Sequence, residues 1–176
     1  MSTIDYIFSV FPVAESLFSA ALLIWLFKSS GERHHLNLSV FFFILSIFYL
    51  MSVFFYSGVQ KTIAVMFVLS LPVTLSILPS FYIYLISLGK RQKITAVRKL
   101  LHYLPALLFF ALLIPFWFVP VDIQHGFVTG TLSDVSGNLL MTFVQGVFKT
   151  GVYVIINAQF AIYIALIFIE LRNYRH

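Results

Sequence analysis

The stretch LLMTFVQGVFKTGVYVIINAQFAIYIALIFI, residues 139–169, decides the fold of this chain. It is 31 residues long and carries one charged side chain, Lys149. A helix needs about 20 mostly apolar residues to cross the hydrocarbon core of a bilayer, so the stretch predicts a transmembrane helix. At 1.5 Å per residue it would be about 46 Å long, more than one upright crossing. We therefore expect this helix to tilt strongly, to protrude, or to break near Gly146 and Gly151.

Polar side chains recur every four residues within this stretch, at Gln145, Lys149, Tyr153 and Asn157. Positions four apart lie on one face of a helix. Hydrocarbon offers these groups no hydrogen-bond partners, so we expect the face to point at protein or at water inside the bundle. Two interpretations stay open: the side chains bond to neighbouring helices, or they line a cavity that opens outward.

The composition of the whole chain points the same way. Of its 176 residues, 61% are hydrophobic and 10% are charged, against roughly 25% charged in a soluble domain. A mean hydropathy of +1.00 and 21 phenylalanines are typical of a polytopic membrane protein. The chain contains no cysteine, which excludes disulfides, thiolate metal sites and cysteine nucleophiles.

Hydropathy predicts an all-α integral membrane protein, a single domain over residues 1–176 with about five transmembrane helices. The first helix is not expected to be a signal peptide, because its leader MSTIDY contains an acid and no Lys or Arg. The predicted spans are residues 7–27, 38–56, 62–88, 104–119 and 139–169.

Lysine and arginine set the expected orientation of the helices. Nine of the 11 lie in residues 28–33, 90–99 and 172–175, on one side of the membrane, whereas Lys61 is alone on the other side. The positive-inside rule places the nine in the cytoplasm. The N-terminus is then outside and the C-terminus inside, as an odd number of spans requires. The positive charge is therefore explained without a nucleic-acid partner.

The third predicted span contains Pro72 and Pro79. Each proline removes a backbone hydrogen bond and favours a kink. We expect the hydroxyls of Ser70, Thr74 and Ser76 to bond to the carbonyls that the prolines leave free.

Two connecting segments differ from plain loops. Residues 90–103 are basic, yet their apolar side chains fall near one helical face, so they form either a short amphipathic helix on the inner membrane surface or an ordinary basic loop. Residues 120–138 form the only long external loop, of a length that is usually functional or disordered. The apolar side chains of the first segment are Ile94, Val97 and Leu101, followed by Leu104.

Glu15 is the second charged residue well inside an apolar span. It and Lys149 lie at similar expected depth, roughly 10–12 Å from the external face at 1.5 Å per residue. A lone charge at such depth costs at least about 2.5–3.5 kcal/mol, which makes the two residues candidate partners, directly or through water. Their pair would either fix the register of two helices or hold a ligand, ion or proton.

The sequence contains no HExxH, no GxSxG, no phosphate-binding glycine loop and no pair of intramembrane aspartates. We therefore expect no enzymatic activity and no cofactor. His34 and His35 are not expected to form a metal site, since no carboxylate has helpful spacing. His125 with Asp122 and Asp134 is a weak candidate for an external metal or pH-sensitive site.

Two short motifs, LPSFYIY at residues 78–84 and KLLHYLP at residues 99–105, resemble a known family. They are similar to the membrane-spanning sensor region of bacterial AraC-type transcriptional regulators and multispan sensor histidine kinases. In that family a P-x-x-Y-x-Y helix leads through a basic loop to a helix that opens with a pattern like L-L-H-F-L-P. The matching residues are Pro79, Tyr82, Tyr84, Leu101, His102, Leu104 and Pro105, with Tyr103 in place of Phe.

The resemblance implies a multi-pass protein of the bacterial inner (cytoplasmic) membrane that passes an external signal to a DNA-binding or kinase output domain. No helix-turn-helix or kinase pattern is present, so we expect a truncated sensor module or a stand-alone relative that binds no nucleic acid by itself. Pro105 is expected at the start of the fourth helix. His102 beside it is expected to bond to a tyrosine hydroxyl, in a rigid corner or a conformational relay.

The leading functional hypothesis is a signal-sensing or relay module in the lipid bilayer that binds a small molecule, lipid or protein near Glu15, Lys149 and residues 120–138. Movement of the kinked third span would then shift residues 90–102 on the cytoplasmic side. The second hypothesis is a small transporter or channel subunit that uses the polar stripe. The third is an assembly subunit whose stripe binds a helix of another membrane protein.

Overall fold

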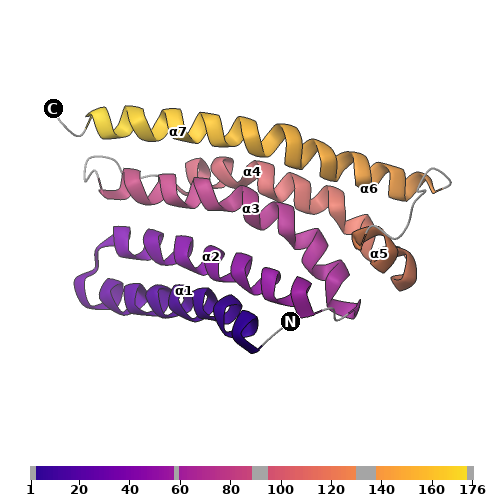
Figure 1. Ribbon diagram of the computed structural model, residues 1–176. Helices are drawn as coiled ribbons and strands as arrows, with labels where there is room; N and C mark the ends of the chain where they lie inside the picture. The colour runs from indigo at the N-terminus through magenta and orange to yellow at the C-terminus, as the bar shows by residue number, and fades with distance from the viewer. Residues whose placement is uncertain (1–2, 58–59, 89–94, 130–137, 174–176) are drawn as a thin grey trace.

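The computed structural model describes residues 3–57, 60–88, 95–129 and 138–173, and it is built of helices throughout these ranges (Figure 1). This confirms the predicted all-α class. Five helices are long and apolar enough to cross a membrane, consistent with a multi-pass membrane protein. The elements in chain order are α1 (Thr3–Ser30), α2 (Arg33–Ser57), α3 (Gln60–Leu88), α4 (Ala96–Leu113), the 3-10 helix η1 (Ile114–Phe118), α5 (Val121–Val128), α6 (Leu139–Thr150), the π-helix η2 (Gly151–Ile155) and α7 (Ile156–Asn173).

The fourth span begins earlier than the sequence predicted. Thr95 caps α4, because its side chain accepts a hydrogen bond from the amide of Arg98. Pro105 was expected at the start of this helix but lies in its interior. Residues 96–103 are therefore the first turns of α4, and the expectation of a separate surface helix or loop is wrong for them. Residues 90–94 lie outside the described residues.

The long helices lie side by side along the molecule (Figure 1). α1 and α2 form a hairpin, α2 packs on α3, and α3 also contacts α4, α5 and α7. Gly31 allows the hairpin turn, since its φ of 71° is a conformation that L side chains rarely adopt. α1 therefore lies on the opposite side of the bundle from α6 and α7, with α2 and α3 between them.

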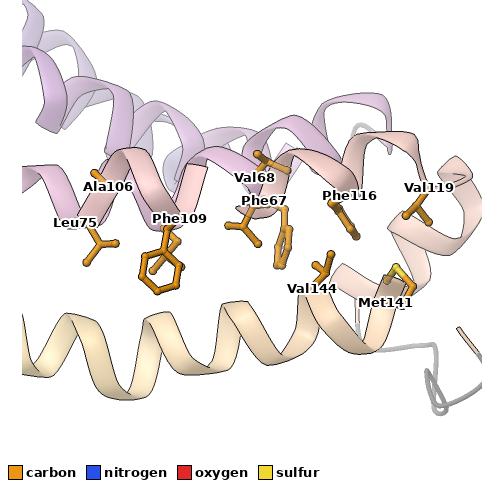
Figure 2. Close-up of a cluster of buried hydrophobic side chains, with 11 residues drawn as sticks. Phe67, Val68, Leu75, Ala106, Phe109, Phe116, Val119, Met141 and Val144 are labelled. Carbon is orange, nitrogen blue, oxygen red and sulfur yellow. The ribbon is translucent and has the colours of Figure 1, made fainter. Parts of the chain in front are cut away.

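An apolar core fills the space between α3, α4, η1 and α6 (Figure 2). Phe67 contributes a ring that stacks on Phe148, with centroids 4.5 Å apart, and lies 4.8 Å from the ring of Phe116. Such aromatic contacts add to the stabilisation that burial alone gives. The buried members of the core are Phe67, Val68, Leu71, Leu75, Ala106, Phe109, Leu113, Phe116, Val119, Met141 and Val144.

The first half of the predicted external loop is folded onto the bundle. α5 packs against α3, and the ring of Phe127 meets that of Phe67 edge to face at 5.5 Å. Gln124 is buried and donates from Nε2 to the carbonyl oxygen of Phe116 at 2.7 Å. Residues 130–137 of the predicted loop lie outside the described residues.

The last span changes its helical type at Gly151. α6 continues through the π-helical turn η2 into α7, so the last span does not break near Gly146 or Gly151, and only its helical type changes at Gly151. A Cβ atom on Gly151 would overlap the side chain of Leu71 and lie 3.0 Å from Phe109, whereas a Cβ on Gly146 would meet nothing within 4 Å. Gly151 therefore lets the last span approach α3 and α4 closely, at a turn type that is frequent in functional sites.

Candidate functional site

The predicted polar stripe lies on the outer surface of the last span. Lys149, Tyr153 and Asn157 are exposed, Tyr153 by 72%, and Gln145 is half-buried. The prediction that this face points into the bundle is therefore wrong. The inner face belongs to residues offset from the stripe, such as Gly151, and two positions along an α-helix correspond to a rotation of about 200°.

Glu15 and Lys149 do not form the predicted pair. Glu15 is exposed on α1, and α1 lies on the opposite side of the bundle from α6 (Figure 1). The cause is the hairpin of α1 and α2, in which α2 packs on α3 and keeps α1 away from the last span. One copy of the chain therefore has no ligand site built jointly from these two charges.

The inner face of α7 satisfies a carbonyl that a proline leaves free. Pro79 has no N–H for the carbonyl of Leu75, four residues earlier in α3. The buried side chain of Gln159 takes that place, with Nε2 lying 2.7 Å from the Leu75 oxygen. An unsatisfied backbone group is costly in an apolar setting. This bond therefore ties the proline site of α3 to the last span.

The hydroxyls expected at this carbonyl bond elsewhere. Ser70, Thr74 and Ser76 each donate to the backbone carbonyl three or four residues earlier. Short hydroxyl side chains reach only this far along a helix. The positions three and four residues after the free carbonyl are Leu78 and Pro79, which carry no hydroxyl, so a long side chain from another helix is needed.

A second polar contact joins three helices near the resembling motifs. His102 Nδ1 of α4 lies 2.9 Å from the hydroxyl of Tyr163 on α7, and Tyr163 is buried. The ring of Tyr82 on α3 lies 5.3 Å from the His102 ring and 5.5 Å from the Tyr163 ring. The expected bond from His102 to a tyrosine hydroxyl is therefore confirmed, with a partner on the last span. Tyr84 instead lies beside Phe81, with ring centroids 6.2 Å apart.

Two more side-chain bonds connect neighbouring helices. The Tyr103 hydroxyl, which replaces a Phe of the resembled motif, lies 2.8 Å from Ser80 Oγ of α3. Lys99 Nζ donates to Asn37 Oδ1 at 2.8 Å and thereby links α4 to α2.

The roles of Gln159, Tyr163 and Asn37 were not predicted from the sequence. A usable signal existed for the first two, which are four residues apart in an apolar span and so share a helix face. Asn37 is a single polar residue near the start of α2, and a lone amide in an apolar segment indicates an interhelical partner without naming it.

An apolar crevice of about 160 Å³ opens between α2, α3 and α4. Its wall is almost entirely hydrocarbon, so it suits an acyl chain better than a polar solute. The lining residues are Ile44, Ile47, Pro72, Val73, Ser76, Ala106, Leu107 and Phe110.

The predicted external cluster stays untested, whereas the prediction for the tandem histidines is contradicted. Asp122 is exposed and His125 half-buried on α5, while Asp134, the third member of the predicted external cluster, lies outside the described residues. At the α1–α2 turn, Glu32 Oε2 lies 3.2 Å from His34 Nε2. The expectation that no carboxylate is placed to join the tandem histidines is therefore wrong.

No protein-family model, curated protein or solved structure matches this chain. Its class is defined by its own structure, a helical bundle with five helices able to span a membrane. The resemblance of residues 79–105 to AraC-type regulators and sensor kinases therefore stays a prediction from the sequence.

Proposed function

We propose that the chain is a non-catalytic relay module of a bacterial inner membrane. It receives a helix of a partner membrane protein on the outer face of α6 and α7, and it passes the resulting displacement to its cytoplasmic end. The N-terminus lies outside and the C-terminus inside, as the distribution of Lys and Arg favours.

The observation that carries the proposal is the exposure of Lys149 within a span. It lies ten residues beyond Leu139, where the candidate span begins, which is about 15 Å along the helix and inside an apolar stretch long enough to cross the hydrocarbon core. An ammonium at such depth costs about 2.5–3.5 kcal/mol on insertion scales. A partner helix with an acidic or amide side chain would offset this cost.

Two neighbours of Lys149 make the same face suitable for a helix. Tyr153 is 72% exposed, and a tyrosine hydroxyl can both donate and accept a hydrogen bond. Asn157 Nδ2 donates to the Tyr153 carbonyl at 2.9 Å, a bond that uses its N–H and not its oxygen. The face therefore offers donors and an acceptor at one-turn intervals.

The inner face of the same span supports the relay. Gly151 packs closely on α3 and α4, Gln159 is bonded to α3, and Tyr163 is bonded to α4. A rotation or tilt of the last span would therefore strain contacts with both helices. The first turns of α4, which carry Arg98 and Lys99, would move as a result.

Two other functions use the same surface differently. A transporter or channel would need several chains arranged around the stripe, because in one chain the stripe lies outside. An assembly subunit would bind its partner through the stripe without any relay. A sensor of the resembled kind would in addition need an output domain on the partner protein.

Photocrosslinking tests the docking face. With p-benzoylphenylalanine in place of Tyr153, we expect one discrete crosslinked protein in native membranes, and we expect Lys149→Ala to remove it. The matched control replaces Phe18, which is 70% exposed on α1. Equal or absent protein crosslinking at both positions would contradict the proposal.

A cysteine reporter tests the relay separately. The chain contains no cysteine, so Arg98→Cys introduces a unique thiol at an exposed position of α4. Its labelling rate with a water-soluble maleimide should change when the crosslinked partner is present, and the change should disappear with Gln159→Leu. A partner that leaves the rate unaltered would identify an assembly subunit.

A further inference from the structure

The turn between α1 and α2 brings together three side chains that can ligate a metal. One ligand atom each from Glu32, His34 and His35 lies within 4.8 Å of the others. Two imidazoles and a carboxylate form a donor set typical of zinc-class metals. This cluster lies outside the docking face and the relay contacts and has no part in either.

The distances within the cluster are close to those that a bound ion imposes. Bonds of 2.0–2.2 Å to a tetrahedral ion place neighbouring donors about 3.4 Å apart. Glu32 Oε2 and His34 Nε2 already lie 3.2 Å apart. The rings of His34 and His35 have centroids 4.2 Å apart. Closure of the site therefore requires a rotation of the exposed Glu32 and the half-buried His34 and His35 side chains, whose ligand atoms already lie within 4.8 Å of one another.

Ser30 orients the third ligand. Its Oγ lies 3.1 Å from His35 Nδ1 and also accepts a hydrogen bond from the backbone N–H of Glu32 at 3.3 Å. A hydrogen bond at one ring nitrogen is the usual arrangement for a ligating histidine, because it fixes the ring and leaves the other nitrogen for the metal. The left-handed Gly31 makes the turn that holds Ser30 and Glu32 together.

We infer that this turn is a binding site for a divalent zinc-class ion, with Glu32, His34 Nε2 and His35 Nε2 as ligands and a water in the fourth position. The positive charge of the adjacent Arg33 repels a bound cation. Lys99 adds to this repulsion, because it is hydrogen-bonded to Asn37, one turn beyond His34 in α2. This repulsion acts on every divalent cation. A single carboxylate does not offset it for hard ions such as Ca²⁺ and Mg²⁺, which need several carboxylates. The two imidazole nitrogens bind Zn²⁺, Ni²⁺ and Co²⁺ strongly enough to offset it.

The test uses the full chain in nanodiscs without a polyhistidine tag. Titration with CoCl₂ should give the visible absorption of a tetrahedral site at one ion per chain, and ZnCl₂ should displace it. Glu32→Gln, His34→Ala and His35→Ala should each weaken Zn²⁺ binding at least tenfold by calorimetry, and His125→Ala should leave it unchanged. MgCl₂ and CaCl₂ should not compete.

Three results would overturn the inference. They are absence of binding at 1 mM zinc, binding that survives all three ligand variants, and a Co²⁺ spectrum that remains octahedral. The first would leave the contact between Glu32 and His34 as a salt bridge only. Thermal unfolding of each variant without metal separates loss of the site from loss of the fold.

Discussion

Gln159 of α7 donates a hydrogen bond to the carbonyl oxygen of Leu75 in α3, over 2.7 Å, at the point where Pro79 removes the backbone donor. A side chain of one span thus completes the hydrogen bonding of another. The two helices are coupled at the proline site, so neither can shift there without exposing a buried carbonyl.

Replacement of Gln159 by leucine should leave the Leu75 carbonyl unsatisfied and lower the free energy of unfolding by about 1–2 kcal/mol. Pro79→Ala restores the missing N–H, so the same replacement should have a smaller effect in that background. Unfolding in mixed micelles measures this double-mutant cycle. Asn157→Leu on the exposed face is the control, and a loss of equal size there would contradict the assigned role.

Gly151 and Gly146 form a matched pair for a packing test. Gly151→Ala should destabilise the fold by about 1–3 kcal/mol, because the new methyl group meets Leu71 and Phe109. Gly146→Ala should be neutral or stabilising by up to about 1 kcal/mol, because its surroundings are open and alanine favours a helix. Leu71→Ala should partly rescue the first variant. Equal effects of the two glycine changes would contradict the close packing of Gly151 on α3 and α4.

Tyr163→Phe deletes one hydroxyl and leaves the ring contacts with Tyr82 in place. We expect a loss of about 0.5–1.5 kcal/mol, since the bond to His102 Nδ1 is lost. Maleimide labelling of Arg98→Cys should become faster in this variant, because α4 loses a tie to the last span. Tyr84→Phe is the control, and an equal change in labelling there would show that the effect is not specific to the His102 contact.

The spans were predictable from the sequence, and the faces of the last span were not. Five apolar segments of about 20 residues leave little alternative to membrane helices. The last span, however, carries two polar rows, one through Lys149 and Tyr153 and one through Gln159 and Tyr163. Spacing shows which residues share a helix face, but it does not show which face turns toward the other helices.

Contacts between residues far apart in the sequence decide which face of the last span turns inward. The carbonyl released by Pro79 lies 84 positions from Gln159 in sequence, and the space beside Gly151 exists only once α3 and α4 are packed. The predicted start of α4 is wrong for a local reason: proline is common in the first turn of a helix, but Thr95 caps α4 ten residues before Pro105. The pairing of Glu15 with Lys149 was predicted from their similar depth, which does not show which helices are neighbours, and the α1–α2 hairpin places α1 on the opposite side of the bundle from α6.

Lys149→Leu separates a docking face from a buried site. Because Lys149 is exposed within a span, leucine should insert more favourably, so the free energy of unfolding of the isolated chain should stay equal or rise. Crosslinking of the partner from position 153 should nevertheless be lost, since the charge that the partner recognises is gone. Glu15→Leu on α1 is the control and should leave crosslinking intact. A loss of stability above about 1 kcal/mol in Lys149→Leu would mean that the ammonium has a partner within its own chain, and the docking face would then have to be abandoned.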